Sequence, residues 1–318
     1  MNNKLKLNNK FYYLFNKIPL TFISMEKWNI LIISGIDRIE YIQKKITCDL
    51  YLLKKNNFIF GSYCNEKGRT ISFFYIFNYK KEIFIIVESS IMKILIKELK
   101  KYSIFSKVCF KKNYKYLLFG IIGSNAKKNI KKIFNIQNIK KKSLFKIKKN
   151  IILYFNKPYK RFLIITNYKK YFNILNNFKK KIKFNDSNQW LLSDIQSGYP
   201  IIDLNNINKF TPQVLNIDKL KGISFTKGCY LGQEVIYSFQ YIKKINKYLF
   251  YFKCILLNKS ISGDLIYIKI KKKWCNIGII LFSCLTINNI NIIQSIIKKH
   301  INLMNIFKIK NNYFNYIN

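Results

Sequence analysis

Residues 227–234 read KGCYLGQE and form the densest run of special-purpose residues in the chain. Two glycines lie four positions apart, and glycine lets the backbone turn tightly or approach a ligand closely. Cys229 lies between them, where the nearby Lys227 can bias its thiol toward the thiolate. The run therefore predicts a tight loop, and the apolar pair that follows at 235–236 predicts a short helix or strand.

A purely structural turn is the alternative interpretation of this run. The Gly-x-x-x-Gly spacing is common in turns, and cysteine is among the most often buried residue types, where it behaves as a small hydrophobe. The eight residues alone leave both interpretations open.

Four other segments accompany this run in a fixed order: 101–108 (KYSIFSKV), 198–203 (GYPIID), 210–213 (FTPQ) and 222–225 (GISF). Together the five segments resemble the YgfZ family of folate-binding, tRNA-modifying proteins, which are relatives of the glycine-cleavage aminomethyltransferase. Their order and spacing fit that family over nearly the whole chain. An eight-residue match with colinear flanks is a specific signal.

The resemblance implies an α+β fold of two packed lobes followed by a small C-terminal β-barrel. The apolar periodicity agrees, because it predicts the order strand, helix, strands, helix twice and then a strand-rich tail from about residue 248. We expect a first lobe over 1–112, a second lobe with the signature loop over 113–245 and the barrel over 246–318. The two lobes should be interleaved as one folate-binding unit.

Individual elements follow from the same patterns. The expected strands of the lobes are 28–34, 58–64, 71–77, 83–87, 116–122, 143–147, 151–155 and 162–166. The expected helices are 38–47, one capped by Ser89 or Ser90 that runs to about 101, 125–134, 170–179, and one that starts at Asp186 or Ser187 and stops at Gly198. Asp37 with Glu40 three positions on resembles a capping box for the first helix. The tail should contain strands at 248–256, 264–270, 275–283, 290–297 and 305–309.

The net charge of +44 is large for 318 residues. Three of the 58 basic residues are arginine, at positions 38, 69 and 161, which leaves 55 lysines. Lysine, asparagine, isoleucine, tyrosine and phenylalanine all have AT-rich codons, so drift in an AT-rich genome explains this composition. Phosphate sites often favour arginine for its bidentate geometry. The charge permits weak, non-specific RNA contact without diagnosing it.

Several site classes are excluded by what the sequence lacks. The seven cysteines form no Cys-x-x-Cys pair, and His300 is the single histidine, so the usual zinc spacings and a Cys-His catalytic pair do not occur. The odd cysteine count fits a reducing compartment. The longest apolar run, about 277–287, is shorter than the roughly 20 residues of a membrane span. We expect a cytoplasmic protein without a membrane span.

Folate requires apolar faces for its rings, a polar group for its pterin edge and cations for its glutamate tail. Trp28 and Trp190 each open an expected element, where core packing is the ordinary role of a tryptophan. The resemblance implies instead that both contact folate, because tryptophans at the matching places do so in the family. Trp274, in the tail, is expected to be structural.

The signature loop supplies the remaining candidates. The resemblance makes Cys229 the reactive group, either as a nucleophile toward a one-carbon unit or as a redox or iron–sulfur contact. Lys227 and Glu234 are candidate folate-binding residues, and Gln233 is expected to cap the loop. Ser238 stands where the family usually has arginine. An anion contact made by that arginine is then missing or has moved to Lys243 or Lys244.

The resemblance implies a folate-binding accessory protein rather than an enzyme with its own turnover. It would bind tetrahydrofolate, support iron–sulfur enzymes that methylthiolate some tRNAs, and be linked to control of the replication initiator. One alternative is a folate-dependent aminomethyltransferase, for which Asp194 and Asp49 are available carboxylates. The other is a basic RNA-binding module without a ligand, although no RNA-recognition signature is present.

Overall fold

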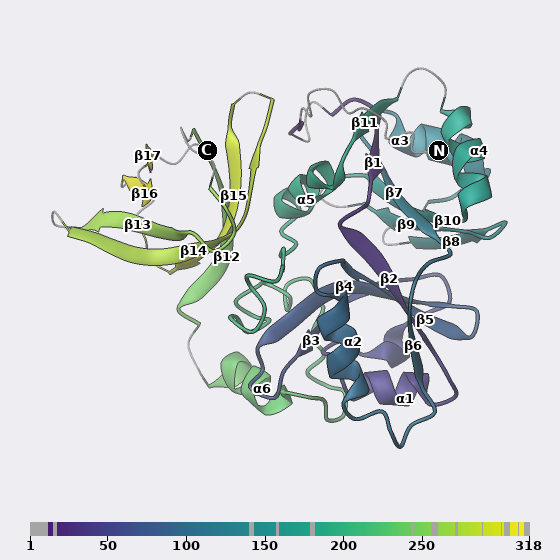
Figure 1. The fold of residues 1–318 in the computed structure, drawn as a ribbon, viewed down its shortest axis with the longest axis horizontal. Coiled ribbons are helices and arrows are strands. Elements are labelled where there is room, and N and C mark those ends of the chain that lie inside the picture. The colour runs from purple at the N-terminus through teal and green to yellow at the C-terminus, as the bar shows by residue number, and fades with distance from the viewer. Residues whose placement is uncertain are drawn as a thin grey trace.

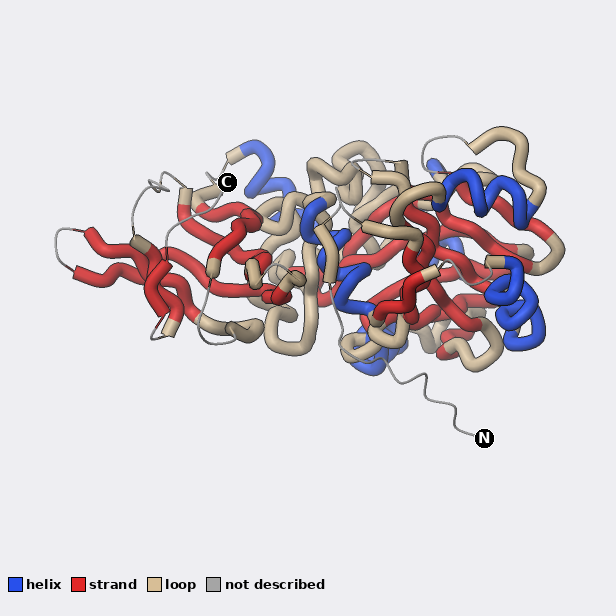
Figure 2. The backbone as a smooth tube through the Cα atoms, turned by 90° about the horizontal axis from the view of Figure 1, so that it is seen from above, coloured by secondary structure: helices blue, strands red, loops and turns tan. Residues whose placement is uncertain are grey.

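The computed structural model describes residues 12–14, 18–139, 143–156, 159–178, 182–242, 245–255, 260–270, 273–287, 289–299, 301, 306–310 and 312–314. These residues form three sheets (Figure 1). Two sheets belong to a pair of packed α+β lobes, and the third follows at the C-terminal end. Figure 2 shows this third sheet at one end of an elongated molecule. None of the described helices is long and apolar enough to cross a membrane.

The first sheet is antiparallel, with strand order β3-β4-β5-β2-β6. Its strands are β2 (Trp28–Ser34), β3 (Ile59–Cys64), β4 (Thr70–Tyr79), β5 (Glu82–Glu88) and β6 (Cys109–Lys112). The helices of this lobe are α1 (Arg38–Gln43), the 3-10 helix η2 (Leu50–Leu52) and α2 (Met92–Lys100). Strands β4 and β5 are buried along nearly their whole length. Their continuous apolar sequences match a sheet that is covered on both faces.

The second sheet has the order β11-β1-β7-β10-β9-β8, and only its β1–β11 pair is parallel. Its strands are β1 (Thr21–Ser24), β7 (Leu117–Ile122), β8 (Ser143–Ile147), β9 (Asn150–Phe155), β10 (Arg161–Thr166) and β11 (Lys183–Asn185). Helices α3 (Ala126–Phe134) and α4 (Tyr168–Asn177) belong to this lobe.

The alternation of side chains along β10 shows how the two lobes share a core. Phe162 and Ile164 pack in a cluster with residues of α3 and α4. Leu163 and Ile165 point to the opposite face and belong to the core that contains the first sheet. The second sheet therefore lies between its own helices and the first lobe. Strand β1 comes from the range expected for the first lobe but lies in the second sheet. The domain boundaries given above stay a prediction.

Helix α5 (Ser187–Gln196) follows β11, and α6 (Gln233–Tyr241) follows the signature loop. The third sheet then runs β12-β15-β14-β13-β16-β17, antiparallel throughout. Its strands are β12 (Lys247–Cys254), β13 (Leu265–Ile270), β14 (Lys273–Leu285), β15 (Asn291–Lys298), β16 (Phe307–Ile309) and β17 (Asn312–Phe314). It has its own apolar cluster, which includes Phe252, Ile268 and Phe307. The predicted fold class is confirmed. In the third sheet, β12 and β17 are the two edge strands, and no pairing among the described residues joins them to each other.

Two predicted helix caps are wrong, because other partners take the capping groups. Asp37 makes no cap hydrogen bond to α1, and its Oδ2 accepts instead from the backbone N–H of Lys107 at 2.7 Å. Helix α2 begins at Met92 without a side-chain cap, and both donors of Ser90 bind the Glu88 carboxylate. The start of α5 is as predicted, since Asp186 accepts from the N–H of Asn188 at 2.9 Å.

Candidate functional site

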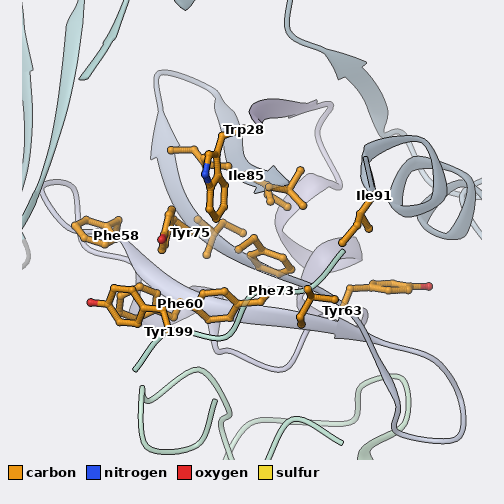
Figure 3. Packing of buried hydrophobic residues seen from close by; sticks show 14 of the residues in the cluster. Trp28, Phe58, Phe60, Tyr63, Phe73, Tyr75, Ile85, Ile91 and Tyr199 are labelled. Atoms are coloured by element: carbon orange, nitrogen blue, oxygen red, sulfur yellow. The ribbon is translucent and has the colours of Figure 1, made fainter. Parts of the chain in front are cut away.

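An aromatic cluster fills the space between the two lobes. It consists of Trp28, Phe58, Phe60, Phe73, Tyr75, Phe155, Trp190 and Tyr199. Figure 3 shows Tyr75 of β4 at its centre, with Trp28 against one face. The two rings are stacked, with centroids 5.6 Å apart and planes 20° apart. Such aromatic pairs add to the stabilisation that comes from buried area alone.

Trp190 of α5 joins this cluster through Phe155 of β9, with ring centroids 5.7 Å apart at 77°. Its indole also lies against Gly120 of β7, where an added Cβ would come within 2.7 Å of the ring. The side chain of Trp190 is fully buried, and Trp28 is 7 % exposed. The structure thus brings together the two tryptophans that the sequence predicted as folate contacts.

A buried ion pair lies inside the aromatic cluster. Arg161 Nη1 is 2.6 Å from Asp194 Oδ1, and the Tyr75 hydroxyl donates to the same carboxylate at 3.2 Å. The Arg161 guanidinium carbon lies 4.8 Å from the Trp190 ring centre and 5.0 Å from that of Tyr199. Burial raises the pKa of the Asp194 carboxyl, and the charge of Arg161 opposes that rise.

The sequence did not indicate Arg161, Tyr75 or Tyr199 as site residues. One signal was present, because a chain that uses lysine at 55 of 58 basic positions has arginine here. Asp194 had been named only as an available carboxylate for an aminomethyltransferase, and it is engaged by Arg161. Asp49, the other such carboxylate, caps η2 through the Tyr51 N–H.

A cleft of about 710 Å³ opens between α5 and the third sheet, and neither tryptophan lines it. Its lining is mixed, and consists of Tyr12, Lys27, Asn188, Asp203, Asn205, Ser260, Ile261, Ser262, Phe282, Ser283, Cys284, Leu285 and Asn291. Lys27 Nζ donates to Asn188 Oδ1 at 2.7 Å and lies 5.7 Å from the centre of the Phe282 ring. These two polar residues precede Trp28 and Trp190 in the sequence by one and two positions.

Lys227 fastens the signature loop to the end of α1. Its buried ammonium donates to the backbone carbonyls of Gln43, Ile46 and Cys48 at 2.5, 2.6 and 3.0 Å. Burial lowers the pKa of Lys227 to about 8. The ammonium is thus directed at three backbone carbonyls at the end of α1 and just after it. The expected effect of Lys227 on Cys229 stays a prediction.

Cys229 itself is exposed at the tip of the loop. Gly232 closes the loop at φ +77°, and a Cβ there would lie 2.4 Å from the carbonyl oxygen of Asn65. Gln233 Oε1 accepts from the Tyr230 N–H at 3.0 Å, which is the capping role expected for it. Glu234 is exposed in the first turn of α6. Lys243 and Lys244, proposed above for a displaced anion contact, lie outside the described residues.

The predicted site residues thus fall into two places, the aromatic cluster and the signature loop. No hydrogen bond, ion pair or ring contact in the described part of the chain joins Lys227, Cys229 or Glu234 to either tryptophan of the cluster. Nor do three or more His, Cys, Asp or Glu side chains gather there in a way that could hold a metal ion.

No family model matches the chain. Curated relatives do match along most of its length. A tRNA-modifying protein YgfZ from Buchnera aphidicola of Schizaphis graminum is 40% identical over 295 residues, which are 92% of each chain. One from Blochmanniella pennsylvanica is 38% identical over 277 residues, 84% of this chain and 83% of that protein.

Among solved structures, the aminomethyltransferase T of the glycine cleavage system from Bartonella henselae superposes with a TM-score of 0.74. The match covers 95% of this chain and 86% of the other at 10% sequence identity, so it concerns the fold alone. The level and extent of the identity to the curated relatives show that the chain belongs to the YgfZ family of tRNA-modifying proteins.

Proposed function

We propose that this protein binds tetrahydrofolate between its lobes and takes part in tRNA modification. The observation that supports the folate proposal is that Trp28 and Trp190 belong to one aromatic cluster, linked through Tyr75 and Phe155. Lys27 and Asn188, their near neighbours in sequence, line a cleft of ligand size. The rings of the folate would pack against the indoles. Its anionic tail would lie toward Lys27, which borders the cleft.

Both indoles are largely buried in this structure. A planar ligand therefore reaches them only when side chains around Tyr75 move, so folate binding should reorganise the aromatic cluster. The tRNA part of the proposal rests on family membership, since the relatives are named for that activity. We further propose that the protein acts in the cytoplasm on iron–sulfur enzymes that methylthiolate tRNA, with a link to the replication initiator, and that Cys229 provides a working thiol at the exposed loop.

Calorimetric titration with tetrahydrofolate tests the ligand. Trp28→Phe and Trp190→Phe are preferable to alanine, because emptying a buried indole site would cost about 3–5 kcal/mol of stability. Each should weaken folate binding in a protein that still folds. Trp274→Phe is the matched control, because Trp274 packs on Tyr313 in the third sheet. Unchanged affinity in both cluster variants would remove the folate assignment.

An aminomethyltransferase is a second candidate, favoured by the fold that the chain shares with the Bartonella protein. That reaction needs a carboxylate free to act at the folate. Asp194 is the carboxylate inside the aromatic cluster, and it is held by Arg161 and Tyr75. This arrangement favours binding over turnover, and an assay of glycine cleavage with the purified protein separates the two.

A further inference from the structure

The loop between α2 and β6, residues 101–108, holds out an apolar tip. Phe105 is 98 % exposed and Ile104 is 83 % exposed. A phenylalanine that leaves its whole surface in water loses the stabilisation that burial of its ring would give. Such a residue points to a partner that covers it.

The tip is held in place by the backbone around it. The N–H of Lys107 donates to Asp37 Oδ2 at 2.7 Å, and the N–H of Ser106 donates to the Ser103 carbonyl at 3.0 Å. Gly35, at φ +109°, lies so close to the Lys107 carbonyl that a Cβ would come within 1.9 Å of its oxygen. The backbone on the C-terminal side of Phe105 is therefore held in place, which lowers the entropic cost of ordering the loop on binding.

The segment that carries this tip is rich in lysine. Residues 97–112 contain six lysines, all exposed and all within a few positions of the loop: Lys97, Lys100, Lys101, Lys107, Lys111 and Lys112. The one acid of this segment, Glu98, is paired with Lys101 at 2.7 Å. The hydroxyl of Tyr102 donates to Glu66, and Lys45 lies 4.2 Å from the centre of the Tyr102 ring.

The mixture of one free ring and many lysines indicates which partner fits. Protein interfaces are depleted in lysine, whereas proteins that bind single-stranded RNA combine stacking aromatic rings with cations along the phosphates. We propose that residues 101–108 contact an unpaired loop of an RNA, with Phe105 stacked on one base and Lys101 and Lys107 near the backbone. This deepens the proposed role in tRNA modification by naming a surface for the RNA.

Composition offers a simpler explanation, because phenylalanine and lysine both have AT-rich codons. Tyr114 serves as the matched control for that explanation. It is 90 % exposed and has Lys111, Lys112 and Lys115 beside it, but it lies in the turn beyond β6. If drift alone exposed these rings, Phe105→Ala and Tyr114→Ala should affect RNA binding equally.

The test is fluorescence anisotropy of a labelled RNA hairpin with an unpaired loop, together with a blunt RNA duplex. Phe105→Ala should weaken hairpin binding on the order of tenfold and leave duplex binding unchanged. Tyr114→Ala should change neither. The double variant Lys101→Gln/Lys107→Gln should reduce the slope of log affinity against log salt, whereas Phe105→Ala should leave that slope unchanged.

Equal losses for Phe105→Ala and Tyr114→Ala, or a hairpin affinity that Phe105→Ala does not change, would overturn the proposal. So would a loss of binding to anionic lipid vesicles with hairpin affinity retained, because the tip would then serve a membrane surface. Folate affinity measured on the Phe105→Ala protein should equal that of the wild type. That measurement separates a failure of this surface from a failure of the folate site.

Discussion

Arg161 and Asp194 form an ion pair from which solvent is excluded, with 2.6 Å between Nη1 and Oδ1 and side-chain exposures of 0% and 2%. One residue opens β10 and the other lies in α5, so the pair connects the second sheet to the helix that carries Trp190. Removing water from both charges is costly, and only the completed pair offsets that cost. The pair therefore fixes the position of α5, and with it Trp190, relative to the second sheet.

Loss of either partner should destabilise the protein strongly. Arg161→Met or Asp194→Leu alone leaves an uncompensated buried charge, for which a loss of about 3–5 kcal/mol of unfolding free energy is expected. The double variant Arg161→Met/Asp194→Leu should recover part of that loss, because no lone charge remains. Urea unfolding of the four proteins measures this. Additive losses in the double variant would show that the two side chains act independently.

The cysteines should divide by exposure when the native protein is alkylated. Cys109, Cys229 and Cys275 are exposed, whereas the other four are buried. Burial also raises the pKa of Cys48, Cys64 and Cys254 to about 12, which removes their reactive thiolate near neutral pH. Mass spectrometry of the labelled protein should find only the first three modified quickly, and folate should slow Cys229 if the ligand reaches the loop.

Cys229→Ser should leave the melting temperature unchanged, because Cys229 is exposed and the hydroxyl of the new serine would remain in contact with water. A working thiol then predicts loss of tRNA methylthiolation in a strain that depends on this protein, while folate binding persists. Full complementation by the serine variant would return Cys229 to a structural role.

Lys227→Met should release the signature loop, since three carbonyls lose their shared donor. Each buried acceptor left without a partner costs about 1–3 kcal/mol. The alkylation rate of Cys229 reports on the loop more directly than overall stability does. In Lys227→Met this rate should change, while the alkylation rate of Cys275, in β14, should not.

The pH dependence of the same variant has a definite sign. Burial lowers the pKa of Lys227 to about 8, below its ordinary 10.5. Between these values the unfolded chain binds more protons, so this residue's contribution to stability is full above the higher value and is lost as the pH falls through the lower one. The stability of wild type relative to Lys227→Met should therefore rise from pH 8 toward pH 10. A difference that stays constant over this range would contradict the lowered pKa.

Gly232→Ala should distort the signature loop, whereas Gly228→Ala should not. Gly232 combines a left-handed backbone with a Cβ position 2.4 Å from the Asn65 oxygen, and nothing lies within 4 Å of the same position at Gly228. The left-handed conformation alone costs an alanine roughly 1–2 kcal/mol. Thermal melts of the two variants provide the comparison, and equal melting temperatures would contradict the role given to Gly232.

Local sequence patterns predicted most of the strands because those strands are apolar along their length. The expected strand 28–34 and the observed β2 (Trp28–Ser34) coincide. The first helix was expected to reach residue 47 but ends at Gln43, since Ile46 bridges to Tyr63 and Thr47 binds the Ser62 carbonyl. Strands β6 and β11 were missed because they are short and largely exposed, so their pairing partners define them.

The site residues also divide into those that the sequence indicates and those that only contacts between distant parts of the chain define. The resemblance to the YgfZ family indicates Trp28 and Trp190, whereas the residues alone favour core packing for both. The partners of Arg161, Asp37 and Lys227 lie 33, 70 and about 180 positions away in the sequence. No periodicity or local motif encodes such contacts, so only the folded chain reveals them.

Strand β1 has a consequence for how this chain is made. It lies between β7 and β11 in the second sheet, so it is synthesised before the other described strands but must wait for partners that begin at Leu117 and Lys183. All the strands of the first sheet are synthesised during that wait. Contacts this distant in sequence slow folding. A fragment that stops at residue 112 contains β1 without the rest of the second sheet. A fragment that begins at residue 113 lacks the strand between β7 and β11. Neither fragment therefore contains a complete folding unit.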